Sequence, residues 1–124
     1  MMCFKLPKLV VETPPVPVER AQISGADLRA LLQAKFPNCQ NIYISDGDEE
    51  LLYLCDIADI QAMLKADDTN RAQYKKAVYD CDDFAYRLFG QFNTEAWGGF
   101  VIGVMWTEIH AMVWALDCNL DFFY

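Results

Sequence analysis

Cys81 is the residue whose type and position most directly suggest nucleophilic chemistry. Apolar side chains follow it at the spacing of an amphipathic helix: Phe84, Ala85, Leu88, Phe89 and Phe92. Asp80 stands where an N-cap belongs, and Asp82 and Asp83 place negative charge in the first turn, where the helix dipole favours it. Backbone N–H groups at a helix start stabilise a thiolate, which is the form of cysteine that attacks. The pattern therefore predicts a helix that begins at Cys81 and directs the thiol toward whatever the helix packs against.

His110 is the single histidine of the chain and could serve as the base for this thiol. It lies 29 residues after Cys81, in a strand-like segment. A cysteine at a helix start that faces a histidine on a following strand is the arrangement of papain-like and transglutaminase-like hydrolases. The backbone N–H of Cys81 would supply one oxyanion donor. Trp97 or Trp106 would shield the pair from water, or else each belongs to the core.

Structural interpretations of these residues stay open. Cys81 can be a small apolar side chain at the top of the helix stripe, and the neighbouring aspartates oppose formation of a thiolate. His110 can be a core histidine bonded to backbone groups. A metal site would combine His110 with the aspartates around Cys81. Carboxylates at adjacent helical positions point about 100° apart, so only one or two of them are expected to converge.

Three pieces of the chain resemble a known group of proteins. They are Tyr-Asp-Cys-Asp-Asp-Phe-Ala at 79–85, Trp97, and Ile-Gly-Val-Met-Trp-Thr-Glu-Ile-His-Ala at 102–111. Together they resemble small phage and prophage proteins, which are similar in turn to the cysteine-protease domain at the C-terminus of a fungal agglutinin. The resemblance covers roughly residues 28–124. It implies a papain-like or transglutaminase-like core, with Cys81 as nucleophile and His110 as base. No cofactor is expected, although the agglutinin domain is calcium-dependent, so the resemblance keeps calcium open without identifying ligands.

The residue that would orient the imidazole is missing from the pattern. In the agglutinin protease domain, an acidic residue follows the histidine on a later strand. A hairpin turning at Cys118 would put the residue opposite His110 near position 126, beyond the 124 residues printed. Asp117, Asn119 and Asp121 are substitutes, but all three lie close to the turn. A truncated triad, a Cys-His dyad and an inactive fold all remain open, so enzymatic activity is uncertain.

Composition and charge restrict the classes of partner. The chain has 124 residues, 54% of them hydrophobic and 23% charged, as expected of an ordinary globular domain. The net charge of −8 argues against nucleic acid or an anionic membrane surface, because both require a basic patch. Five cysteines without a Cys-x-x-Cys pair indicate reduced thiols in the cytosol and argue against a cysteine zinc site. No apolar run is long enough to span a bilayer.

Residues 1–22 are expected to form an extended, proline-rich arm. Pro7, Pro14, Pro15 and Pro17 disfavour helices and strand ladders there. The segment is either a loose leader or an arm that docks on a partner, because Phe4, Leu6, Leu9, Val10 and Val11 are too apolar for a purely solvating tail. The start Met-Cys-Phe-Lys at 2–5 also looks like the starts of some short phage virion-associated proteins. The expected partner is either a protein or peptide substrate or, if the arm docks, a phage or host protein bound by residues 1–20.

Residues 23–124 read as one α+β domain. Ser24 and Asp56 are expected to cap two helices that bury Leu28, Leu31, Leu32 and Phe36, and Ile57, Ile60, Met63 and Leu64. Strands are predicted at 41–45, 51–55, 100–106, 110–116 and 120–124. The first two would form a hairpin around an acidic turn at 46–50, which lacks the later ligands of an EF-hand loop. The strands 100–106 and 110–116 are apolar on both faces and are expected to be central in the sheet.

The combined prediction is three helices packed on a largely antiparallel sheet, with a papain-like or transglutaminase-like core and an extended N-terminal arm. The predicted function is a cysteine-hydrolase-like phage or prophage protein that cleaves or transfers peptide or isopeptide bonds through Cys81 and His110. The alternative is a non-catalytic virion component or host-interaction module that retains the fold. Either protein would act in the cytoplasm of a bacterial host or in association with a virion.

Overall fold

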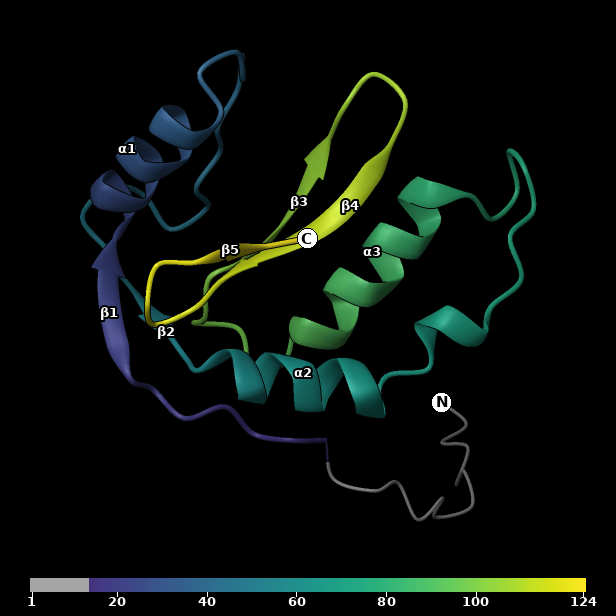
Figure 1. Cartoon of the computed structure of the whole chain (residues 1–124), viewed down its shortest axis with the longest axis horizontal. Coiled ribbons are helices and arrows are strands. Elements are labelled where there is room, and N and C mark those ends of the chain that lie inside the picture. The colour runs from purple at the N-terminus through teal and green to yellow at the C-terminus, as the bar shows by residue number, and fades with distance from the viewer. Residues whose placement is uncertain (1–13) are drawn as a thin grey trace, which may run out of the picture.

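The computed structural model describes residues 14–124 and, at Asn70, the backbone alone. Three α-helices and two small antiparallel sheets make up a mixed α/β fold (Figure 1). In chain order the elements are β1 (Ala21–Ser24), α1 (Gly25–Lys35), β2 (Leu51–Leu54), α2 (Ile57–Ala66), the 3₁₀ turn η1 (Thr69–Arg71), α3 (Cys81–Phe92), β3 (Ile102–Trp106), β4 (Ala111–Leu116) and β5 (Phe122–Phe123). The prediction of three helices and antiparallel strands is confirmed, but the strands form two sheets instead of one.

The helix starts are confirmed where the sequence predicted caps. The Ser24 hydroxyl accepts the Asp27 N–H at 3.1 Å, and the Asp56 carboxylate accepts the Ala58 N–H at 2.8 Å. These bonds satisfy backbone donors that have no partner inside a helix. In α2, Ile60 and Met63 are buried, whereas Leu64 is exposed. The expectation that Leu64 is buried is therefore wrong: it shares a face with Ile57 and Ile60, but it lies in the last turn of α2, where it is not covered.

The predicted hairpin of 41–45 with 51–55 is wrong. Residues 41–45 form no strand, and β2 pairs instead with β1, in a register that aligns Ile23 with Leu52. The cause lies in the turn at 46–50, whose carbonyl groups are used by the start of α1. The N–H of Gly25 donates to Glu50 O at 3.0 Å, and the N–H of Ala26 donates to Asp48 O at 2.9 Å. The segment 46–50 therefore packs against the start of α1 and does not bring 41–45 alongside β2.

Residues 14–20 have no regular secondary structure and are bonded to the rest of the chain. The Trp97 indole donates to Pro15 O at 2.9 Å, and the Val18 N–H donates to an Asp59 carboxylate oxygen at 2.9 Å. Pro17 is buried, and β1 begins at Ala21, two residues inside the range expected for the arm. The apolar part of the arm that was expected to dock on a partner, residues 4–11, lies outside the described residues.

The three-stranded sheet has the order β3-β4-β5, with helices on both of its faces. Figure 1 shows α3 along one side of the β3–β4 hairpin, α1 on the other, and α2 across the base. Ala115 packs in a core cluster with Phe92 of α3, whereas Leu116 packs in a second cluster with Leu28 of α1. Strand β4 is central, as predicted. The expectation that 100–106 is also central holds only at its start, where Phe100 bridges Tyr53; β3 itself pairs only with β4 within residues 14–124 and is half-buried.

Two glycines provide a test of this packing. A methyl group at Gly25 would collide with the Gly47 carbonyl oxygen, whereas one at Gly90 would meet nothing within 4 Å. We expect Gly25→Ala to lower the free energy of unfolding by about 2 kcal/mol or more, because the backbone must shift. The matched control Gly90→Ala should raise it by about 0.5–1 kcal/mol, because alanine favours the helix. Urea unfolding of both variants measures this, and equal effects would contradict the contact between α1 and the 46–50 turn.

Candidate functional site

Cys81 is the first residue of α3 and is half-buried. It shares a helix face with Ala85, one turn further along, and Ala85 is buried against the sheet. The Asp83 carboxylate accepts the Asp80 N–H at 3.1 Å, which fixes the start of the helix. The structure therefore places Cys81 as the sequence predicted: at the start of the helix and on the side that faces the sheet.

His110 lies in the turn between β3 and β4 and is exposed. The Thr107 N–H donates to His110 O at 2.7 Å, so the antiparallel register of β3 and β4 continues to this pair. Successive side chains of a strand point to opposite faces. Ala111 and Ala115 are buried on the α3 side of the sheet, and alternation therefore assigns His110 to the opposite face, with Met112.

Cys81 and His110 lie at the same end of the hairpin, and the alternation of the strand assigns the imidazole to the face away from α3. Figure 1 shows α3 beginning beside the turn end of β3 and β4. Within the described residues no hydrogen bond joins the Cys81 sulfur to the His110 ring, and His110 uses its backbone carbonyl to close the turn. Alternation directs the imidazole away from α3. Proton transfer needs hydrogen-bond reach or one bridging water, so a catalytic pair would require the imidazole to turn toward α3.

The three candidates for an orienting residue belong to a different part of the molecule. The buried Asp117 carboxylate accepts the N–H groups of Asn119 and Asp121, each at 2.9 Å. It thereby holds the turn between β4 and β5. Seven residues, or about 23 Å of extended chain, separate it from His110. None of the three residues can orient the imidazole in this structure.

The carboxylates at the start of α3 converge more than expected. Oxygen atoms of Asp80, Asp82 and Asp83 all lie within 4.8 Å of one another, so the expectation that only one or two would converge is wrong. The reason is that Asp80, as the N-cap, has an extended backbone and is not a helical neighbour of the others. Its carboxylate accepts the Ala77 N–H at 3.1 Å. Two of the three groups are thus used as acceptors for backbone N–H groups, and His110 is on the other face.

Sequence reasoning missed an exposed apolar surface at the turn end of the hairpin. The rings of Tyr86 and Trp106 are 5.8 Å apart, and these side chains are 54% and 58% exposed. Ile109, at the tip of the turn, is 92% exposed. We call these three residues the tip surface. Trp97, by contrast, is a core residue. The sequence contained one indication of this surface: Tyr86 lies off the apolar stripe of its helix and must therefore be exposed.

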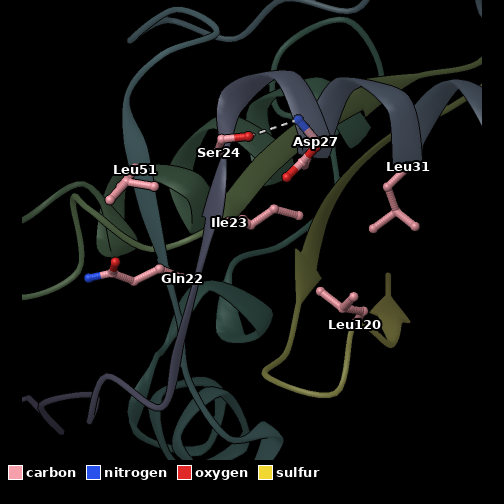
Figure 2. Close-up of a pocket in the computed structure, with 7 residues that line it drawn as sticks. All are labelled: Gln22, Ile23, Ser24, Asp27, Leu31, Leu51 and Leu120. Carbon is pink, nitrogen blue, oxygen red and sulfur yellow. Dashed lines mark hydrogen bonds between the residues drawn. The ribbon is translucent and has the colours of Figure 1, made fainter.

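A separate depression lies between the end of β1, α1 and the turn after β4 (Figure 2). It is open, encloses about 700 Å³, and is lined by Gln22, Ile23, Ser24, Asp27, Leu31, Leu51 and Leu120. Leu120 has a φ of 61°, an unfavourable value for a bulky side chain. The Ser24 hydroxyl is occupied by the Asp27 N–H, as drawn in Figure 2. The lining contains neither Cys81 nor His110, so the depression is not part of the predicted site.

Comparison of the chain with protein-family models, with curated proteins and with solved structures finds no match. The helices of residues 14–124 are all too short or too polar to cross a bilayer.

Alkylation kinetics test the geometry of the predicted pair. Because the imidazole faces away from α3, we expect His110→Ala to change the rate of Cys81 labelling by iodoacetamide by less than about twofold at neutral pH. The exposed Cys39 serves as the internal reference, and Cys55 should label slowest, because burial raises the pKa of its thiol to about 12. Peptide mapping by mass spectrometry gives the labelling rate of each cysteine. A tenfold or greater loss at Cys81 alone would restore the catalytic pair.

Proposed function

We propose that this chain is a non-catalytic protein-interaction module, and that it binds a phage or host protein through the tip surface. The observation that carries the proposal is the joint exposure of Tyr86, Trp106 and Ile109. Tryptophan and tyrosine dominate the energetic centres of protein interfaces. Exposed contiguous apolar side chains rimmed by polar residues mark such interfaces on soluble domains. The assignment of His110 to the face away from α3 supports a binding role over a catalytic one.

The backbone of β3 adds a second means of recognition at the same place. The hydrogen-bonded pair Thr107–His110 fixes the alternation of the ladder, so that Gly103 and Met105 direct their backbone groups toward β4. Val104 and Trp106 direct theirs outward, where no strand pairs with them within residues 14–124. An open edge of this kind can accept an extended segment of a partner as an added strand.

The charges beside the tip surface favour a partner with basic side chains. Asp82 lies one helical turn before Tyr86, and Glu108 lies in the turn next to Ile109; both are exposed. Arg87, the one basic residue of α3, is already paired with Asp68 at 3.0 Å. Complementary charge at the rim of an interface raises the association rate and selects partners. The net charge of −8 acts in the same direction.

The hydrolase remains the second candidate, and one observation favours it. Cys81 begins a helix whose first turn lies at the same end of the hairpin as His110. A peptide or isopeptide hydrolase would require the turn at 107–110 to rotate the imidazole across the sheet edge to reach the thiol. Under this alternative, Cys81 attacks the carbonyl carbon and His110 acts first as base and then as acid.

Affinity capture from a lysate of the bacterium that carries the chain separates the two functions. We expect Trp106→Ala and Ile109→Ser to reduce the amount of retained partner at least about tenfold, because each removes an interface anchor. Tyr43→Ser is the matched control, since Tyr43 is 88% exposed on the loop after α1, away from the tip surface. Cys81→Ser should retain the partner fully. Loss of binding with Cys81→Ser, or equal binding by the tryptophan variant and the control, would contradict the interaction module.

A further inference from the structure

Cys55 and Cys118 lie next to each other at the place where the two sheets meet. Cys55 directly follows β2, and Cys118 lies in the turn after β4. The N–H of Cys118 donates to the carbonyl oxygen of Cys55 at 2.8 Å. Both residues carry free thiols. Neither belongs to the predicted catalytic pair or to the tip surface, so the function proposed above leaves them unexplained.

The hydrogen bond limits how far apart the two Cα atoms can be. Adding the N–Cα bond of Cys118, the 2.8 Å bond and the distance from a carbonyl oxygen to its own Cα gives at most about 6.7 Å. Disulfide-bonded cysteines have Cα atoms roughly 4.4–6.8 Å apart. The Cα atoms of the pair are therefore close enough for a disulfide.

The two thiols differ in access. Cys55 is fully buried, and burial, together with the nearby Asp59 carboxylate, raises the pKa of its thiol to about 12. The Cys118 thiol contributes to this rise in pKa to a smaller extent. Cys118 is only half-buried. A reagent in solution will therefore meet Cys118 first, and Cys55 can act only as the second, resolving thiol.

We propose that Cys55 and Cys118 form an oxidation site that a low-molecular-weight disulfide converts into an intramolecular disulfide. In the first step, the Cys118 thiolate attacks one sulfur of the reagent, forming a mixed disulfide and releasing one thiolate. In the second step, the Cys55 thiolate attacks the Cys118 sulfur and releases the second reagent thiolate. The two protons of the protein thiols end on the two released thiols. The protein dithiol is oxidised and the reagent disulfide is reduced to two thiols.

The bond would fasten the end of β2 to the end of β4. These ends belong to separate sheets, which share a core cluster and are also hydrogen-bonded through Tyr53. The Tyr53 N–H donates to Gly99 O at 2.8 Å, and its carbonyl accepts the Val101 N–H at 3.1 Å. A cross-link between positions 55 and 118 closes a loop that contains α2, α3, β3 and β4. Long closed loops give large stabilisation by restricting the unfolded chain.

Treatment of the full chain with glutathione disulfide at pH 8 tests the proposal. We expect a product that has lost two hydrogens, a tryptic cross-link between the peptides of Cys55 and Cys118, and a melting temperature raised by about 5 °C or more, reversed by dithiothreitol. The rate of disulfide closure should rise about tenfold per pH unit, because the pH is well below the pKa of the Cys55 thiol and the thiolate fraction grows in proportion. Cys39→Ser and Cys81→Ser are controls that should still close.

Two variants make the outcome decisive. Cys55→Ser should stop at one glutathione on Cys118, and Cys118→Ser should leave Cys55 unmodified in the folded protein. Cys55 is a core residue, so its variant can fail to fold. In that case the variant at the half-buried Cys118 tests the order of the two steps by itself. A wild-type chain that keeps glutathione on Cys118 without closing, or a cross-link to Cys39 or Cys81 instead, would overturn the proposal.

Discussion

The packing of α3 against one face of the β3–β4 hairpin is the constraint on which the rest of the molecule depends. Ala85 of the helix and Ala111 and Ala115 of β4 are all buried there, and their small side chains let the helix lie close to the sheet. Once these alanines face α3, the alternation of the strand assigns its remaining side chains to the other side. Trp114 accordingly stacks on Phe122, with ring centres 5.4 Å apart, on the side of α1. The same alternation assigns the His110 side chain to the face away from α3.

This constraint also explains why the turn end of the hairpin is open while its base is closed. At the base, both faces of β4 are covered, and Tyr53 joins the hairpin to the smaller sheet through a parallel bridge with Phe100. At the turn, only the first turns of α3 reach the sheet, and Trp106 has Tyr86 as its aromatic neighbour. A long hairpin covered at one end leaves backbone and aromatic groups available at the other. A protein-binding role and a stable core therefore use different parts of the same strands.

The helices of this fold and the β3–β4 and β4–β5 hairpins could be predicted from sequence, but the pairing of β2 with β1 could not. Helix starts are local: Ser24, Asp56 and Asp80 sit directly before apolar residues at helical spacing, and each helix begins where they indicate. Strand pairing depends on contacts between distant residues, so 41–45 looked like a strand although the adjacent turn caps α1. The face of His110 could not be predicted either. Residues 111–116 are apolar on both faces of the strand, so the sequence shows no alternation of apolar and polar residues that would indicate which face meets the helix.

The face occupied by the His110 imidazole is the most direct test of the account, because the choice between a binding module and a hydrolase depends on it. In an isotope-labelled sample, nuclear Overhauser contacts of the His110 ring protons report which side chains lie beside it. The structure predicts contacts with the side chains of Met105 or Met112, on the face away from α3, and none with the β-protons of Cys81. A contact between the His110 ring and Cys81 would contradict the assignment and restore the catalytic pair.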